Sequence, residues 1–173
     1  MRWVFVCTAN IARSPYAERR MAQLLGEQSP IVVASAGVPG YDGRPMDELM
    51  ARQLAKRGAD GGDHASRVLT EEILRSSNLV LTMEFSHHLK ILEAWPWAAD
   101  RVRGLGQFAR AVAKADLQGA GTVEERVAAV LQASGRNSMA WDVADPHRRG
   151  RRAAKKAAEE IDQHLHALLP LVQ

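Results

Sequence analysis

The chain contains a single cysteine, Cys7, which ends a short apolar run and is followed six residues later by Arg13. If a strand turns into a helix at this point, the thiol lies beside free backbone N–H groups and the positive end of the helix dipole. Both favour the thiolate and bind a tetrahedral oxyanion. Arg13 would hold two oxygens of that anion as a bidentate clamp. Nucleophile and anion site would then coincide, as displacement at phosphorus requires.

The residues between and after this pair make the pattern more specific. A cysteine on a buried strand is more often an inert core residue than a catalyst. Here, however, Cys7 is followed by the polar stretch TANIARS, with Ser14 directly after the arginine. Pro15 stands in the first turn of the expected helix, where proline is tolerated. These features favour a phosphate-binding loop over a core cysteine.

The motif CTANIARSP resembles the phosphate loop of the low-molecular-weight protein tyrosine phosphatase family, whose pattern is close to C-x-G-N-x-C-R-S-P. The resemblance continues in sequence order through most of the chain. It includes ASAG at 34–37, YDGRPMD at 41–47, HASRVLT from residue 64, LVLTMEFSH at 79–87, and VADPHRRG, which carries Asp145-Pro146 and resembles the family's acid loop. Several matches in the expected order are far more specific than the first motif alone.

The resemblance implies three catalytic residues. Cys7 would attack phosphorus and form a cysteinyl-phosphate intermediate, which water then hydrolyses. Arg13 would stabilise the charge on the equatorial oxygens. Asp145 would protonate the leaving phenolate and then activate water. Because a residue before proline avoids the helical region, Pro146 would keep Asp145 in an extended loop.

The resemblance also implies binding and supporting residues. The substrate-binding set comprises Thr8, Ala9, Asn10, Ile11, Ala12, Ser14, Tyr41 and His147. Tyr41 would flank the aryl ring of the substrate, Asn10 tolerates the left-handed backbone of a tight anion nest, and Ser14 would donate a hydrogen bond to the thiolate. The supporting set comprises Ser35, His64 and Pro146. Its two polar members resemble family positions that hold Asn10 and Ser14 in place.

Three positions depart from the family pattern. Ala12 stands where the family often has a second cysteine, so a protective disulfide with Cys7 cannot form. His147 follows the proline of the acid loop, where tyrosine or phenylalanine is common. With the arginines after it, His147 predicts a more cationic and less aromatic rim, so an acidic phosphopeptide, or a substrate other than phosphotyrosine, stays an open alternative. Ala9 replaces a frequent glycine and must still fit the loop backbone.

Strands and helices that would position these residues alternate along the chain. Short apolar runs predict buried strands at 2–7, 31–36, 79–83 and about 101–105. Periodic segments predict helices at about 14–27, 46–57, 70–75, 123–133 and 149–169. This alternation predicts an α/β fold, a three-layer sandwich with a central parallel sheet of about four strands, helices on both faces and the phosphate loop after strand 1. We expect one domain over residues 1–173, with an insertion around 106–144.

Composition and charge limit the other functions. At 173 residues and 46% hydrophobic, the chain can form a core without disulfide or metal staples. One cysteine favours a reducing, cytoplasmic compartment, and no apolar run approaches a membrane span, so no membrane partner is expected. Much of the net charge of +3 lies at 147–152, which lacks interleaved aromatic residues, so nucleic-acid binding is not expected. No metal or other cofactor is expected, because no histidines or carboxylates show ligand spacing beyond the adjacent His87 and His88, which would point to different sides of a helix.

The residues thus favour a cysteine-dependent phosphomonoesterase, a protein-tyrosine-phosphatase that acts on a phosphotyrosine protein or a small aryl phosphate. Two alternatives stay open. An arsenate reductase with this loop would have to use an external small thiol, because the chain lacks the two further cysteines of the self-contained versions. A non-catalytic phosphate-binding regulatory module would need the loop but not Asp145. The sequence does not indicate the physiological substrate, the oligomeric state or the role of 106–144.

Overall fold

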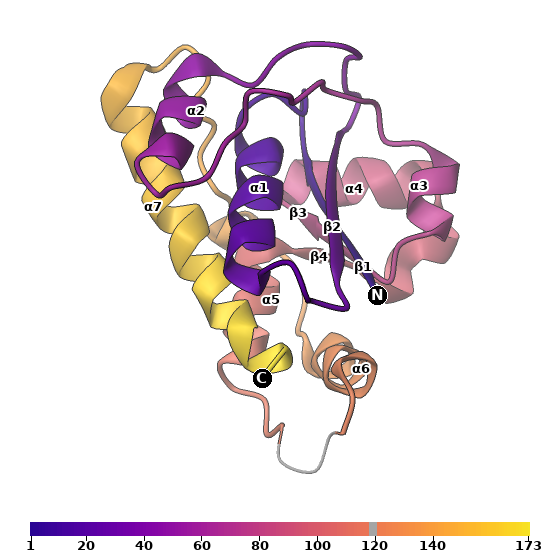
Figure 1. Ribbon diagram of the computed structural model, residues 1–173. Helices are drawn as coiled ribbons and strands as arrows, with labels where there is room; N and C mark the ends of the chain where they lie inside the picture. The colour runs from indigo at the N-terminus through magenta and orange to yellow at the C-terminus, as the bar shows by residue number, and fades with distance from the viewer. Residues whose placement is uncertain (118–120) are drawn as a thin grey trace.

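A four-stranded parallel sheet forms the centre of the computed structural model, which describes residues 1–117 and 121–173 (Figure 1). Its strands are β1 (Arg2–Cys7), β2 (Val32–Gly37), β3 (Leu79–Thr82) and β4 (Val102–Gly104), in the order β2-β1-β3-β4. All three strand pairs are parallel, as the sequence predicts. Parallel strands end at a common edge, where α/β proteins bind their ligands. Cys7 lies at that edge, paired in register with Gly37.

Helices cover both faces of the sheet, which confirms the predicted three layers. The helices are α1 (Arg13–Leu25), α2 (Glu48–Ala55), α3 (Glu71–Arg75), α4 (Phe85–Ala94), α5 (Leu105–Val112), α6 (Val123–Ala133) and α7 (Gly150–Leu168), with short 3-10 turns η1 (Pro96–Asp100), η2 (Met139–Trp141) and η3 (Leu169–Leu171). Figure 1 shows α1 and α7 on one side of the sheet and α3 and α4 on the other.

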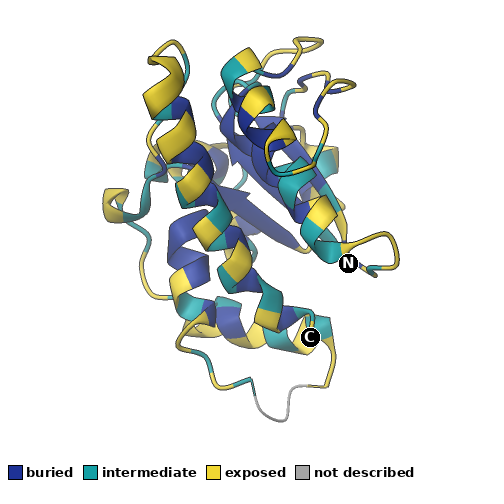
Figure 2. Cartoon of the chain, turned by 60° about the vertical axis from the view of Figure 1, so that its left-hand side comes forward, coloured by how far each residue is buried: buried dark blue, intermediate teal, exposed yellow. Residues whose placement is uncertain are grey.

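The two core clusters follow from the alternation of side chains along the strands. Trp3 and Phe5 of β1 face the layer of α1, α2, α5, α6 and α7, and both are fully buried. Val4 and Val6 face the opposite layer and pack with residues of α3 and α4. Figure 2 shows the sheet and the inward helix faces buried, with exposed residues gathered on the outward faces. Burial of this apolar surface stabilises the framework that carries the loops.

Helix α7 shows how the sequence pattern produces the packing. Its apolar residues recur every three or four positions, and the buried ones are Ala154, Ala157, Ala158, Ile161, Leu165 and Leu168. This stripe packs against α1, α2 and α5. The alanines of this stripe lie in the first half of the helix, which follows the segment that carries Asp145.

The segment 106–144 contributes to the same core in its described part. Phe108 of α5 and Val127 and Val130 of α6 are buried in the cluster that contains Trp3. Residues 118–120 lie outside the described residues. Helix α5 was not predicted, and it follows β4 without a loop. That the chain is one domain with an insertion here stays a prediction. Of the helices in the described ranges, none is long and apolar enough to cross a membrane.

Candidate active site

The loop between β1 and α1 forms a pocket of about 130 Å³ at the carboxyl edge of the sheet. It is lined by Cys7, Thr8, Ala9, Ile11, Ala12, Arg13, Asp145 and His147. The three residues predicted to be catalytic, from segments far apart in the chain, thus share one pocket. A hollow of about 260 Å³ beside α5 and α6 is larger, but its lining has no thiol, hydroxyl or carboxylate. The chemistry therefore points to the smaller pocket.

Cys7 is buried at the base of this pocket, and its Sγ lies 3.0 Å from Oγ of Ser14. The Ser14 hydroxyl accepts a hydrogen bond from Nδ2 of Asn10 at 3.0 Å and lies 3.3 Å from the carbonyl oxygen of Ala36. Since a hydroxyl has one proton to donate, Ser14 donates either to Ala36 or to the sulfur. The hydroxyl proton of Ser14 is therefore within reach of the sulfur of Cys7.

Asn10 fixes the shape of the phosphate loop from behind. Its φ of 57° lies in the left-handed region, and its side chain is fully buried. Nδ2 donates to Ser35 Oγ at 2.7 Å, Oδ1 accepts from the backbone N–H of Arg67 at 3.0 Å, and the backbone oxygen lies 2.7 Å from Nε2 of His64. The structure thus gathers the predicted supporting residues Ser35 and His64 around Asn10. Asn10 and Ser14 stand behind the loop and do not line the pocket.

Gly37 allows the loop to pack tightly against the second strand. A Cβ atom at this position would stand 2.7 Å from the Cα of Gly40 and 2.9 Å from the carbonyl oxygen of Thr8. Both are backbone atoms, so any larger residue would displace the phosphate loop. The glycine of the ASAG stretch therefore has a steric role at the site.

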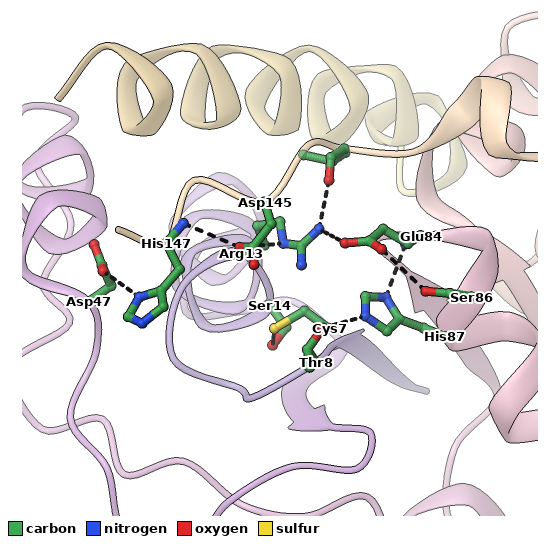
Figure 3. Close-up of polar contacts among 11 residues, drawn as sticks. Cys7, Thr8, Arg13, Ser14, Asp47, Glu84, Ser86, His87, Asp145 and His147 are labelled. Atoms are coloured by element: carbon green, nitrogen blue, oxygen red, sulfur yellow. Dashed lines mark hydrogen bonds and ion pairs between the residues drawn. The ribbon is translucent and has the colours of Figure 1, made fainter. Parts of the chain in front are cut away.

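Arg13 closes the loop from the first turn of α1 and is almost fully buried. Its Nη1 donates to the carbonyl oxygen of Val143 at 2.7 Å and to Oε1 of Glu84 (Figure 3). Its Nε lies 3.5 Å from Oδ1 of Asp145 and has no hydrogen-bond partner within the described part of the chain. A buried N–H donor without a partner is costly. Arg13 therefore offers a donor to an oxyanion bound in the pocket.

Glu84, which the sequence analysis did not single out, holds Arg13. Burial raises the pKa of Glu84, but the hydrogen bond and charge of Arg13 outweigh burial and keep that pKa below its usual value. Glu84 is thus ionised and balances the buried guanidinium. The sequence feature that could have indicated Glu84 is its position two residues after β3, because the ends of parallel strands meet at one edge of the sheet.

His87 was also missed, and it contacts the phosphate loop. Its Nδ1 accepts a hydrogen bond from the backbone N–H of Glu84 at 3.1 Å, and its Nε2 lies 2.8 Å from Oγ1 of Thr8. Burial and then the charge of Arg13 lower the pKa of His87 to about 4, so the ring is neutral at neutral pH. With Nδ1 as acceptor, the single ring proton is on Nε2 and is donated to Thr8. The Thr8 hydroxyl then keeps its own proton for a ligand.

The acid loop brings Asp145 and His147 to the rim. The Asp145 side chain is 43% exposed, so it reaches both the pocket and water. Its Oδ1 accepts from the backbone N–H of His147 at 3.3 Å. The ring Nδ1 of His147 lies 3.1 Å from Oδ2 of Asp47, which caps the N-terminus of α2. This contact ties the acid loop to α2, while Pro146 is buried beneath it.

Tyr41, predicted to flank the substrate ring, does not line the pocket. Its side chain is exposed, and the guanidinium of Arg44 stacks on the ring at 4.5 Å. The role of Tyr41 stays a prediction. Within residues 1–117 and 121–173, no three His, Cys, Asp or Glu side chains are grouped as metal ligands would be.

Comparison with known proteins decides the family. A sequence model described as low molecular weight phosphotyrosine protein phosphatase matches residues 2–120. The chain belongs to this family. The predicted family is thereby confirmed, and with it the assignment to a family of hydrolases with a cysteine-based phosphatase mechanism.

One relative of the chain is the low molecular weight protein-tyrosine-phosphatase Etp of Escherichia coli, which is 38% identical over 104 residues. These residues make up 60% of this chain and 68% of Etp. The solved structure of a low molecular weight protein tyrosine phosphatase from T. tengcongensis is 30% identical, with a TM-score of 0.76 and 98% of each chain covered. The YwlE arginine phosphatase from Geobacillus stearothermophilus is 26% identical, with a TM-score of 0.75 over 98% of this chain and 90% of that one. The structural similarity thus extends over α7 and the segment before it.

Proposed function

We propose that the chain is a protein-tyrosine-phosphatase that transfers the phosphoryl group of phosphotyrosine first to Cys7 and then to water. The observation that carries the proposal is the meeting of Cys7, Arg13 and Asp145 in one pocket of about 130 Å³. A phosphate-binding module would need no acid at the rim, and neither would an arsenate reductase that draws on an external thiol. The placement of Asp145 therefore favours the phosphatase over both alternatives.

In the first step, the backbone N–H groups of the loop and the Nε–H of Arg13 bind the phosphate oxygens. The Cys7 thiolate attacks phosphorus, the S–P bond forms, and the bond from phosphorus to the tyrosine oxygen breaks. Asp145 gives its proton to the leaving oxygen, which departs as neutral tyrosine. Fixed donors around the equatorial oxygens stabilise the transition state without reorganising.

In the second step, the roles of the side chains reverse. The Asp145 carboxylate removes a proton from water, and the resulting hydroxide attacks phosphorus as the S–P bond breaks. Inorganic phosphate leaves, Asp145 is again protonated, and Cys7 returns as a thiolate. Ser14, at 3.0 Å from the sulfur, then donates its hydroxyl proton and stabilises this leaving group.

The pocket suits an aryl phosphate. Cys7 is only 3% exposed, so the phosphoryl group has to reach the base of the pocket while the peptide backbone stays outside. The ring of phosphotyrosine spans that depth, whereas the single carbon of phosphoserine holds the phosphate close to the backbone. The apolar side chain of Ile11 and the methyl groups of Ala9 and Ala12 on the lining would contact the ring. Because the nucleophile has to stay reduced, we infer that the enzyme acts in a reducing compartment, the cytoplasm.

Initial rates on three peptides of one sequence, which carry phosphotyrosine, phosphoserine or phosphoarginine, test this proposal. The third peptide is included because YwlE is described as an arginine phosphatase. With chelator present, we expect the wild type to favour phosphotyrosine, Cys7→Ser to be inactive, and Asp145→Asn to be slower by at least about a hundredfold, the usual contribution of general acid catalysis. Faster turnover of phosphoarginine, or wild type that binds vanadate without turnover, would overturn the proposal.

A further inference from the structure

A second hollow, of about 440 Å³, lies between α2 and α7. Its base is formed by Leu49 and Gln53, and its walls carry the cationic side chains of Arg52, Lys56, Arg151, Arg152 and Lys155. All five cationic residues are exposed, and none of the lining residues is acidic. We call this hollow the α2–α7 groove. Its walls concentrate positive charge in a concave surface, which raises the local concentration of anions.

Most of this charge is not balanced within the protein. Arg52 pairs with Glu48 and Lys155 with Glu159, in both cases along one helix and at the surface. Such exposed pairs are weak and exchange readily with other anions. Lys56, Arg151 and Arg152 form no ion pair with the described residues. The groove therefore has cationic groups free for a partner.

The position of the two arginines on α7 is unfavourable for the isolated protein. Arg151 and Arg152 lie in the first turn of this helix, which has no acidic residue there and no side-chain cap. Cations at the positive end of a helix dipole destabilise it. By contrast, α2 is capped by Asp47 and starts with Glu48. Local choices that oppose stability are expected at functional sites, where a ligand compensates for them.

The groove is next to the catalytic pocket. His147 lines the pocket and contacts Asp47, the capping residue of α2 (Figure 3). The first groove residue on α2 is Leu49, two residues after Asp47, and α7 begins three residues after His147. Figure 1 shows these two helices side by side at the end of the molecule where β1 runs into the phosphate loop. A peptide held by its phosphoryl group would extend over the His147–Asp47 contact into the groove.

We propose that the α2–α7 groove binds acidic side chains that flank the phosphorylated residue of the substrate, so that the enzyme selects acidic phosphopeptides. This inference rests on the proposed phosphatase function. The negative charge of carboxylates complements the five cationic side chains of the groove. Nucleic acid suits the groove less well, because no aromatic side chain lines it for base stacking.

Two phosphotyrosine peptides test the proposal, one flanked by Asp and Glu and one by Ser and Ala. We expect the wild type to turn over the acidic peptide with a kcat/KM about tenfold higher than that of the neutral peptide. The difference should lie mainly in KM, because charges at the rim of a binding site speed the association of an oppositely charged partner. In Arg151→Glu/Arg152→Glu the preference should vanish, while kcat and KM for a small aryl phosphate stay unchanged. Because Debye screening weakens exposed charge pairs, added salt should reduce the wild-type preference.

A control variant with the same change in net charge distinguishes an effect of the groove from an effect of net charge. Lys114 and Arg136 line the hollow beside α5 and α6. Lys114→Glu/Arg136→Glu should keep the preference for the acidic peptide. The groove variant should unfold at the same or a higher temperature than wild type, because acidic residues suit the start of α7. Poor folding therefore does not explain a lost preference.

Each remaining outcome has a distinct meaning. If wild type shows no preference for the acidic peptide, or the groove variant keeps it, the proposed groove function is wrong. If wild type is inactive even on the small aryl phosphate, the phosphatase function fails instead, and the groove proposal fails with it. A third outcome would assign the groove to nucleic acid and overturn the proposal. In that case an oligonucleotide binds the wild type but not the groove variant, while both proteins show the same peptide preference.

Discussion

The ring Nε2 of His87 lies 2.8 Å from the hydroxyl oxygen of Thr8, which links the start of α4 to the phosphate loop. The other ring nitrogen, Nδ1, accepts a hydrogen bond from the backbone N–H of Glu84. The ring proton is therefore on Nε2, and His87 donates a hydrogen bond to the Thr8 hydroxyl oxygen. This fixes the direction of the threonine hydroxyl. We therefore expect His87 to be a positioning residue that acts through Thr8, which lines the pocket.

A double-mutant cycle tests this link. Thr8→Val should reduce kcat/KM on an aryl phosphate about tenfold, the value of one hydrogen bond to a charged oxygen. His87→Leu should cause a similar loss, and the double variant should lose little more than either single one, because both changes remove the same donor. His88→Leu, one residue along α4, serves as control. Additive losses would show that His87 does not act through Thr8.

The pH dependence of stability should report on His87. Its pKa is lowered to about 4 in the folded protein, against an ordinary value of 6.5. Between these values the unfolded chain binds a proton that the folded protein does not, so the free energy of unfolding should fall as pH decreases from 6.5 to 4. Urea unfolding across this range should show a steeper decline for wild type than for His87→Leu. Parallel curves would contradict the neutral, buried imidazole.

Glu84→Gln should destabilise the protein without bound anion, because the more exposed Asp145 is then the one carboxylate paired with the buried Arg13 guanidinium in the described part of the chain. Since Glu84 is partly exposed, the loss should stay below the about 3–5 kcal/mol that breaking a fully buried pair costs. Glu48→Gln, which removes an exposed partner of Arg52, should cost less than about 1 kcal/mol. Phosphate or vanadate should raise the melting temperature of Glu84→Gln more than that of wild type, since the anion supplies the missing charge. An equal rise in both proteins would contradict this role of Glu84.

Oxidation should inactivate the enzyme irreversibly. Peroxide converts a thiolate to the sulfenic acid and then to products that thiols do not reduce. Cys7 is the one cysteine of the chain, and Ala12 stands where the family often has a second. After prolonged exposure to peroxide alone, dithiothreitol should restore little activity to wild type and more to Ala12→Cys. Full recovery of wild type would contradict this prediction.

The layered fold was predictable because its signals are local. The apolar runs at 2–7 and 79–83 gave strands within one residue of β1 and β3, and the helix at 123–133 matches α6. Helix α5 was missed although Leu105, Phe108, Ala109 and Val112 have helical spacing. The alanine and glycine content around it suggested an insertion, and only the packing of Phe108 in the main core shows its place.

Part of the site was predictable for a different reason. Cys7 ends β1 and Arg13 begins α1, with only the short phosphate loop between them, so their proximity follows from the motif. Glu84 lies directly before α4 and His87 lies in its first turn. No spacing in the sequence relates these two residues to Thr8 or Arg13. Their roles depend on strand order, which sets β3 beside β1.

The most direct test of the central claim is to look for phosphate on Cys7. Asp145→Asn should form the cysteinyl phosphate with p-nitrophenyl phosphate, whose leaving group needs little protonation, but should hydrolyse it slowly. After acid quench, mass spectrometry of the Asp145→Asn protein should find one added phosphoryl group, confined to the peptide that contains Cys7, and none in Cys7→Ala/Asp145→Asn. Turnover by wild type without any phosphoryl group on Cys7 in Asp145→Asn, or with an equal phosphoryl group in Cys7→Ala/Asp145→Asn, would contradict the mechanism.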